Sequence, residues 1–272
     1  MTLISTDWLN KNLNRVKIVD ASWHLVKNRN AIEEYNEEHI KNAIFFDLDK
    51  NSNQKKDLPH NHFLPPISNH EKAISEMGIL NSDRIIIYCY SDLISSCRAW
   101  FQFLYFGHDP KLVSILNGGM KKWKLEGREV TNLKTKIIPS NYKAKENKNM
   151  IKVKSQIDDN IKRKEFTILD ARSKNRFLGL EPEPRPGIKS GSIEGSKSLP
   201  LSEIVNAKDN TFLNTKKLRN IFNSGQINSH KTVMSCGSSV SAASLALAYS
   251  LINDDYIPKI YIGSWTEFGK NK

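Results

Sequence analysis

The chain of 272 residues has only three cysteines, Cys89, Cys97 and Cys236. An odd number of thiols in a chain without a recognisable secretion signal argues against a disulfide framework. No CxxC pair is present, and His60 and His62 lie close together without a second ligand pair at zinc-like spacing. We therefore expect neither disulfides nor a metal site.

Long apolar runs are also missing. No window of 18 apolar residues occurs, so we expect no membrane span and no membrane partner. The N-terminal stretch MTLISTDWLNKNLNR lacks a basic region followed by an apolar core, which predicts a cytoplasmic protein.

Negative charge is scarce, with 29 Asp and Glu against 41 Lys and Arg and a net charge of +12. The lysines are scattered, however, and no run of five basic residues or aromatic–basic RNA-binding signature occurs. We therefore expect no nucleic-acid partner. A basic surface would instead attract small anionic substrates.

What the sequence does contain is an internal repeat. Four segment pairs recur in the same order: IVDAS (18–22) with ILDAR (168–172), HIKNA (39–43) with SIEGS (192–196), IIIYC (85–89) with TVMSC (232–236), and NGGMKKW (117–123) with IGSWTEF (262–268). Their offsets lie between 145 and 153 residues. Four matches at nearly one offset indicate two copies of one domain.

The two predicted domains are residues 1–135 and 150–272, and a polar stretch at about 132–150 that contains Pro139 is the predicted linker. In each half, short β-branched runs alternate with helical patterns. This alternation predicts an α/β fold in which each half is a mainly parallel sheet flanked by helices. Ligands of such sheets bind at the carboxyl ends of the strands, where Cys89 and Cys236 both fall.

The loop after the strand 231–235 carries the strongest chemical signal. Cys236 begins this loop, small residues follow it, and an apolar helix is expected from about Ser241 or Ala242. Such a loop turns its N–H groups inward, and the following helix N-terminus adds positive partial charge. Together they favour a thiolate near neutral pH. The competing interpretation is a cysteine that simply packs in the core.

Three chemistries use a cysteine in such a loop. A cysteine phosphatase needs an arginine after the loop, but Ala242 stands there. A cysteine hydrolase needs a histidine base and space for an acyl group, which this enclosing loop restricts. In sulfur transfer, the thiolate takes up a sulfur atom and becomes a persulfide surrounded by N–H donors.

These residues resemble a known family. CGSSVSA (236–242) is similar to the active-site loop CGSGVTA of the 3-mercaptopyruvate sulfurtransferases, which are tandem rhodanese-domain proteins. RFLGLEPEPRPGIKSGSIEG (176–195), VDASWHL (19–25), HIKNAIFFDLD (39–49), RAWFQFLYFGH (98–108), NGGMKKW and YIGSWTEF also resemble family motifs. The resemblance covers nearly the whole chain and implies two tandem rhodanese-like domains.

The resemblance implies roles for individual residues. Cys236 would be the nucleophile and persulfide carrier, while Arg176 and Arg185 would bind the carboxylate and keto group of a 2-oxo acid. The loop residues Gly237, Ser238, Ser239, Val240 and Ser241 would form the cradle around the sulfur. Arg185 has acidic neighbours in EPEPRPG, so a salt bridge is the alternative for its side chain.

The resemblance further implies a Ser-His-Asp relay of Ser238, His62 and Asp49. His60 is a rival for the histidine, because the loop before it is slightly longer than the family's. The first half would then contribute to the site of the second. The alternative is that both histidines lie in a solvated loop.

Several positions depart from the family pattern. Ser239 stands in place of glycine, which would strain the loop if it requires a positive φ. Ser241 replaces threonine and keeps the hydroxyl, and Ser192 replaces a histidine.

In the first half, the residues after Cys89 are longer and bulkier than the cradle sequence, so this half is expected to be catalytically silent. Cys97 is expected in the core.

The resemblance implies transfer of sulfane sulfur from 3-mercaptopyruvate through Cys236 to a thiol such as thioredoxin, or to cyanide, with release of pyruvate. It implies no cofactor and a monomer. Uncharged residues after Cys236 favour this monoanionic donor over thiosulfate. The alternatives are a thiosulfate sulfurtransferase and a non-catalytic rhodanese-like binding or carrier module.

Overall fold

The computed structural model describes residues 2–25, 28–224 and 231–270. It divides into two compact units whose boundary lies between Asn147 and Lys148, inside the predicted linker. Two short segments group with the other half of the sequence: residues 54–63 belong to the second unit and residues 207–211 to the first. The sequence repeat did not indicate either exchange.

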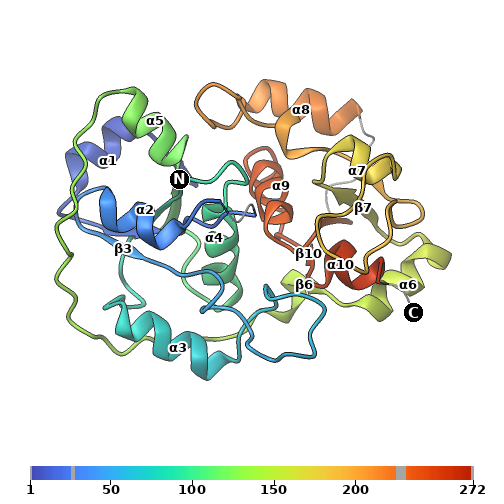
Figure 1. Ribbon diagram of the computed structural model, residues 1–272, viewed down its shortest axis with the longest axis horizontal. Coiled ribbons are helices and arrows are strands. Elements are labelled where there is room, and N and C mark those ends of the chain that lie inside the picture. Colours follow the sequence, from blue (N-terminus) through green and yellow to red (C-terminus); the bar gives the residue numbers. More distant parts are fainter. Residues whose placement is uncertain (1, 26–27, 225–230, 271–272) are drawn as a thin grey trace. The chain divides into compact units, whose positions relative to one another are not determined.

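The first unit contains a five-stranded parallel sheet with strand order β1–β5–β4–β2–β3 (Figure 1). Its strands are β1 (Leu3–Ile4), β2 (Lys17–Asp20), β3 (Ala43–Phe45), β4 (Ile85–Tyr88) and β5 (Val113–Leu116). Its helices are α1 (Thr6–Asn12), α2 (Ala31–Glu37), α3 (Ile67–Glu76), α4 (Ser96–Tyr105) and α5 (Gly119–Leu125). The central strand β4 is fully buried and rich in isoleucine, as a strand covered on both faces requires.

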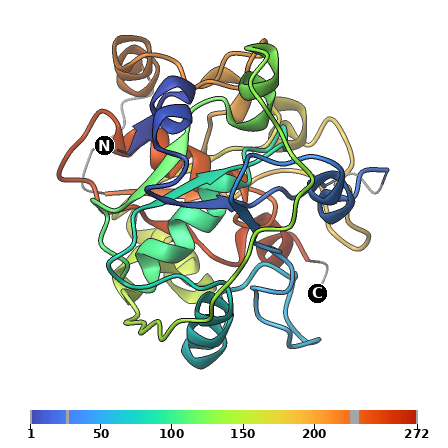
Figure 2. The same ribbon diagram turned by 90° about the vertical axis from the view of Figure 1, so that its left-hand side faces the viewer.

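Helices cover both faces of this sheet. α1 and α5 lie together on one side, and α3 lies on the other (Figures 1 and 2). Leu9 of α1 and Trp123 of α5 share one buried core cluster with Ile86 of β4. On the opposite face, His70 of α3 stacks on Phe106, which directly follows α4. The expected parallel α/β architecture is confirmed.

The second unit repeats the arrangement element by element. Its parallel sheet has strand order β6–β10–β9–β7–β8, which is the first order with each strand replaced by its counterpart. Its strands are β6 (Ile151–Lys152), β7 (Thr167–Asp170), β8 (Lys197–Ser198), β9 (Thr232–Ser235) and β10 (Ile260–Tyr261). Its helices are α6 (Lys154–Arg163), α7 (Lys174–Leu178), α8 (Thr215–Ser224), α9 (Ser241–Ser250) and α10 (Ser264–Phe268), with short 3₁₀ turns η1 (Lys148–Met150) and η2 (Leu201–Glu203). The internal repeat read from the sequence is thus confirmed.

The apolar helix α9 is buried from Ala242 to Tyr249, which agrees with its hydrophobic residues on every side. Phe222 of α8 packs against Tyr249 of α9 on one face of the second sheet. α6 and α10 share a core cluster that contains Ile157 and Trp265. Each sheet is therefore buried on both faces, and the edge formed by the carboxyl ends of its strands holds the polar residues described below.

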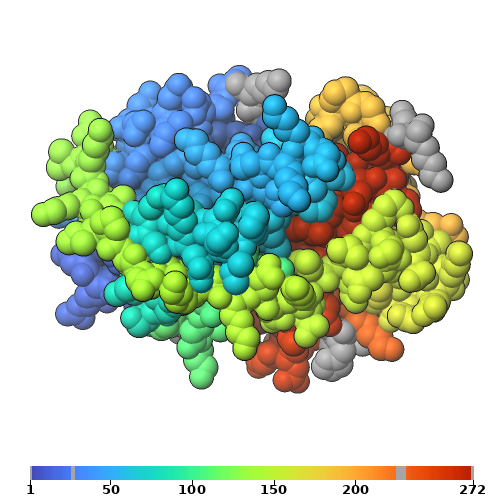
Figure 3. Space-filling model, turned by 90° about the horizontal axis from the view of Figure 1, so that it is seen from below, coloured from blue at the N-terminus to red at the C-terminus, as the bar shows by residue number. Residues whose placement is uncertain are grey.

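The segment 132–147 contains no helix or strand and runs along the first unit beside α3 (Figure 3). The Ser140 amide donates to the Ser75 carbonyl at 2.9 Å, and the Tyr142 amide donates to Ser75 Oγ at 2.9 Å. These bonds satisfy backbone groups that would otherwise need water. None of the helices in the described part of the chain combines the length and apolar composition needed to cross a bilayer.

Candidate active site

The cysteine loop occupies the five residues between β9 and α9, as the sequence predicted. Cys236 stands first in the loop and is 1% exposed, and Val240 ends it at 2% exposure. Ser241 is the first residue of α9 and is half-buried. The sulfur therefore lies at the carboxyl end of a central strand and before a helix N-terminus, where the partial charge favours an anion.

α10 fixes the backbone of this loop from one side. The Cys236 carbonyl accepts the Trp265 amide at 2.8 Å, and the Gly237 carbonyl accepts the Thr266 amide at 3.0 Å and Thr266 Oγ1 at 2.6 Å. In a trans peptide the N–H points opposite to the C=O. The amides of Gly237 and Ser238 are therefore turned away from α10, as a cradle for an anion requires.

Ser239 behaves differently from the two residues before it. Its amide donates to Ser264 Oγ at 3.0 Å, so this N–H points toward α10. Its φ is +60°, in the left-handed region where a Cβ is unfavourable. The side chain is fully buried, and its hydroxyl lies 3.4 Å from the His62 carbonyl oxygen. The loop thus does need a positive φ at the position where the family carries glycine.

Two guanidinium groups converge over Gly237. Arg176 Nη2 lies 3.2 Å, and Arg185 Nη1 3.6 Å, from the position that a Cβ of Gly237 would take. Arg185 Nη2 also donates to Ser238 Oγ at 3.0 Å. The two predicted substrate-binding arginines are therefore together, directly beside the cysteine, and the missing side chain of Gly237 leaves them room.

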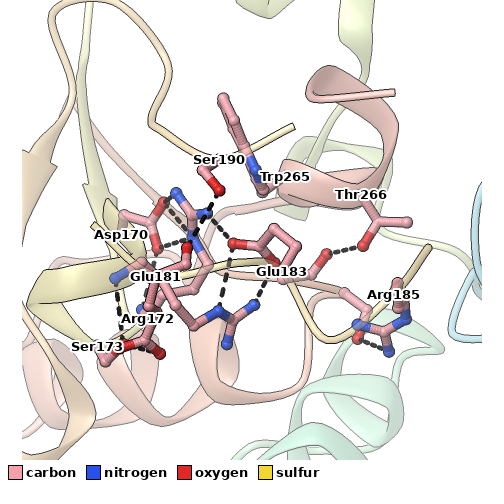
Figure 4. Close-up of polar contacts among 12 residues, drawn as sticks. Asp170, Arg172, Ser173, Glu181, Glu183, Arg185, Ser190, Trp265 and Thr266 are labelled. Carbon is pink, nitrogen blue, oxygen red and sulfur yellow. Dashed lines mark hydrogen bonds and ion pairs between the residues drawn. The ribbon is translucent and has the colours of Figure 1, made fainter. Parts of the chain in front are cut away.

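Sequence reasoning missed a chain of buried charges behind these arginines (Figure 4). Arg172 donates to both oxygens of Asp170, at 2.7 and 3.0 Å, and to Glu183 Oε1 at 2.7 Å. Glu183 in turn accepts from Arg176 Nη2 at 2.5 Å and from Arg176 Nε at 3.2 Å. The repeat held a signal for Arg172, because ILDAR has arginine where IVDAS has Ser22.

Arg172 keeps its charge although its side chain is only 1% exposed. Burial lowers the pKa of Arg172, but the hydrogen bonds and charges of Asp170 and Glu183 outweigh this effect and raise the pKa overall. The guanidinium also lies 4.7 Å from the ring centre of Trp265, a cation–π distance. Arg172 thus ties β7, the Glu183 segment and α10 together.

The two histidines take different positions within the second unit. His62 Nδ1 lies 3.0 Å from Ser238 Oγ. Since Ser238 Oγ already accepts from Arg185, its own proton is available to His62 when that nitrogen is unprotonated. The predicted Ser238–His62 pair is therefore formed, although its role in catalysis stays a prediction.

His60 instead supports the segment that carries His62. Its Nδ1 accepts the His62 amide at 3.0 Å, which leaves the proton on Nε2, and Nε2 lies 3.0 Å from the Ile262 carbonyl. Both histidines are buried, at 5% and 2% exposure, so neither lies in a solvated loop. These contacts favour His62 over its rival as the partner of Ser238.

Asp49, the third predicted member of the relay, belongs to the first unit. There its Oδ2 accepts a hydrogen bond from Trp23 Nε1 at 3.1 Å. Its place in the relay stays a prediction. No group of three His, Cys, Asp or Glu side chains suited to a metal ion occurs among the residues that the structure describes.

Cys89 occupies the corresponding position of the first unit, after β4 and before α4. Its Sγ lies 3.4 Å from Ser96 Oγ. Burial raises the pKa of the Cys89 thiol, despite hydrogen bonds with Ser96 and Ser91 that act in the other direction. The thiol is thus disfavoured as a nucleophile. Cys97 is fully buried in α4, as expected.

The fold and the cysteine loop define a protein built from rhodanese-like halves, and the family model described as Rhodanese-like domain matches residues 5–126. Thiosulfate/3-mercaptopyruvate sulfurtransferase 1, mitochondrial, of Arabidopsis thaliana is 35% identical over 98% of this chain and 75% of its own length. Human 3-mercaptopyruvate sulfurtransferase is 32% identical over 98% of this chain and 91% of its own length. The chain belongs to this family of thiosulfate/3-mercaptopyruvate sulfurtransferases.

A solved structure leads to the same family. SseA from Escherichia coli, described as a 3-mercaptopyruvate sulfotransferase with the rhodanese fold, matches with a TM-score of 0.85 and 28% sequence identity. The match covers 97% of this chain and 99% of SseA. The tandem rhodanese fold and the family expected from the motifs are thereby confirmed.

Proposed function

We propose that this protein transfers sulfane sulfur from 3-mercaptopyruvate to Cys236, releases pyruvate, and passes the sulfur to a thiol or to cyanide. One observation carries the proposal: Arg176 and Arg185 meet over Gly237, the residue after the cysteine. A 2-oxo acid presents adjacent planar oxygens, which guanidinium groups bind in a fixed orientation. Two arginines beside a thiolate thus hold such a donor with its sulfur next to Cys236.

In the transfer step the Cys236 thiolate attacks the donor's sulfur. The new S–S bond forms while the C–S bond breaks, and the electron pair of that bond leaves on the pyruvate enolate. The proton of the donor's thiol ends on the methyl carbon of pyruvate, so that atoms and charges balance. Ser238 and His62 lie within proton-transfer distance of one another and would carry this proton. Asp49 would act as the third member of the relay.

The persulfide then carries negative charge on its outer sulfur. The amides of Gly237 and Ser238 and the N-terminus of α9 would stabilise that charge. An acceptor thiolate attacks the outer sulfur, takes it up and regenerates the Cys236 thiolate. Thioredoxin or a small thiol fits this role, and the cycle needs no cofactor.

There are two alternative functions, one within the sulfurtransferase class and one outside it. Thiosulfate is the alternative donor, and the Arabidopsis relative carries both substrate names. The uncharged Gly237 and Ser238 favour the monoanion over this dianion. A non-catalytic carrier or binding module is the second alternative, and the strained Ser239 is the feature that favours it.

We also propose that the first domain, residues 1–135, is catalytically silent and that residues 150–272 form the catalytic domain. The raised pKa of the Cys89 thiol supports this division.

The protein would act as a cytoplasmic monomer without nucleic-acid or membrane partners. Fractionation of the source cells tests the compartment, since the Arabidopsis relative is named as mitochondrial.

The test of the proposed function compares Cys236→Ser with Cys89→Ser. With 3-mercaptopyruvate and a thiol acceptor, wild type and Cys89→Ser should release pyruvate and sulfide at similar rates, while Cys236→Ser should lose at least about 10³-fold in rate, as expected when a nucleophile is removed. Mass spectrometry should find one extra sulfur atom on Cys236 after donor alone. Turnover with thiosulfate alone would support the first alternative, and no turnover with either donor would support the second.

A further inference from the structure

Three buried charges and one half-buried charge alternate in sign beside the cysteine loop. They run from Asp170 through Arg172 and Glu183 to Arg176, with side-chain exposures of 1%, 1%, 2% and 15%. Figure 4 shows Glu183 with Asp170 and Arg172 on one side of it and Arg185 on the other. Asp170 already binds Arg172 through both carboxylate oxygens. Because Asp170 largely balances the positive charge of Arg172, the negative charge of Glu183 mainly offsets the positive charge of Arg176.

Glu183 controls both the charge and the orientation of Arg176. It occupies the edge of the guanidinium formed by Nε and Nη2, at 3.2 and 2.5 Å. The Nη2 group of the same arginine lies beside Gly237. Arg176 thus approaches the cysteine loop as one half of an ion pair, with one fixed edge of the guanidinium left for a ligand.

We propose that Glu183 is a specificity-determining residue, which limits the positive potential at the donor site and thereby favours a monoanionic 2-oxo acid thiol over the thiosulfate dianion. This inference rests on the proposed function and identifies the residue that determines which sulfur donor is preferred. A dianion gains about twice as much as a monoanion from each added positive charge nearby. By offsetting the charge of Arg176, Glu183 removes most of this additional binding energy for the dianion. It also fixes the orientation of Arg176 so that the guanidinium can bind a planar carboxylate.

The decisive variant is Glu183→Gln, which keeps the shape of the side chain and removes its charge. We expect the ratio of kcat/KM for 3-mercaptopyruvate to kcat/KM for thiosulfate to fall about tenfold, because the added positive potential favours the dianion. The KM for thiosulfate should fall by more than the KM for 3-mercaptopyruvate, because the dianion gains about twice as much from the added positive potential. Both donors are measured on the same preparation, so a partly unfolded sample leaves the ratio unchanged.

Glu181→Gln is the matched control. It removes the same charge two residues away, where the Glu181 carboxylate accepts a hydrogen bond from the Ser173 hydroxyl at 3.3 Å. Its donor ratio should equal that of wild type. Glu183→Asp keeps the charge and should restore most of the preference. A purely structural role for Glu183 predicts equal losses for both donors, and an unchanged ratio in Glu183→Gln overturns the proposal.

Equilibrium binding separates this inference from the proposed function. In a Cys236→Ser background, calorimetry with pyruvate as the monoanion and sulfate as the dianion should show the same shift in relative affinity on Glu183→Gln. A shift in binding without turnover of either donor would leave the charge role standing while the sulfurtransferase proposal fails. Turnover with 3-mercaptopyruvate but no shift in either ratio would leave the enzyme and remove the charge role.

Discussion

At the scale of single residues, Ser239 is the position where the cysteine loop departs furthest from the lowest-energy backbone. A residue with a Cβ at φ of +60° costs on the order of 1–2 kcal/mol relative to glycine. A hydrogen bond from the serine hydroxyl to the His62 carbonyl, at 3.4 Å, offsets part of this cost. It thereby links the cysteine loop to the segment that carries His62.

Comparing Ser239→Gly with Ser239→Ala separates strain from hydrogen bonding. Both variants lose the hydroxyl, but only alanine keeps a Cβ at positive φ. We expect the glycine variant to be more stable than the alanine variant by about 1 kcal/mol in urea unfolding. Equal stabilities would mean that the loop relaxes out of the left-handed region when the hydroxyl is removed.

At the scale of elements, the short helix α10 is the brace of the cysteine loop. The same brace exists in the first unit, where the Met120 amide at the start of α5 donates to the Cys89 carbonyl at 3.0 Å. The second unit adds the hydroxyl of Thr266, which donates to the Gly237 carbonyl at 2.6 Å. Because the Gly237 carbonyl points toward α10, the amide of Ser238, which belongs to the same peptide group, points away from α10.

Thr266→Val tests the brace, since valine keeps the shape of threonine and lacks the hydroxyl. We expect kcat to fall about tenfold with little change in KM, because a loosened amide donor affects the developing persulfide charge more than donor binding. Thr266→Ser should restore most of the rate. A loss confined to KM, or no rescue by serine, would argue against this role.

At the scale of the whole molecule, two units of one topology bury different polar side chains. The first unit places buried histidines where α3, α4 and the segment 132–147 meet. His70 stacks on Phe106 with ring centres 4.0 Å apart, and its Nδ1 lies 3.4 Å from Gln102 Nε2. Burial, with a smaller effect from His108, lowers the pKa of His70 from 6.5 to about 3.

The lowered pKa of His70 predicts that stability falls on acidification. The unfolded chain binds a proton below about pH 6.5, whereas the folded chain does not until about pH 3. The stability is therefore fully present above pH 6.5 and declines as the pH falls, by about 2 kcal/mol at pH 5. His70→Phe should remove this part of the pH dependence in urea unfolding at pH 7 and pH 5. An equally steep decline in the variant would place the effect elsewhere.

Much of this protein is set by local patterns in the sequence. Apolar β-branched runs such as Ile85–Tyr88 form strands, because their side chains favour a pleated surface buried on both faces. Repetition of these runs at one offset predicts two equivalent sheets. The position of Cys236 between a buried strand and a helix follows from the same pattern, as does the room that Gly237 leaves. Apart from the repeat itself, each of these features depends on residues close together in the chain.

Other features were decided by the tertiary structure. Sequence spacing left His60 and His62 as rivals, and only their contacts with Ile262 and Ser238, 202 and 176 residues away, distinguish them. Likewise, the sequence left a salt bridge between Arg185 and the acids of EPEPR as an alternative, but Glu183 pairs with Arg172 and Arg176. The sequence by itself thus determines the elements and the position of Cys236 between them, because backbone preferences and hydrophobic burial act locally. The tertiary structure decides which charges and hydroxyls meet, because such contacts join distant segments whose distances no local pattern encodes.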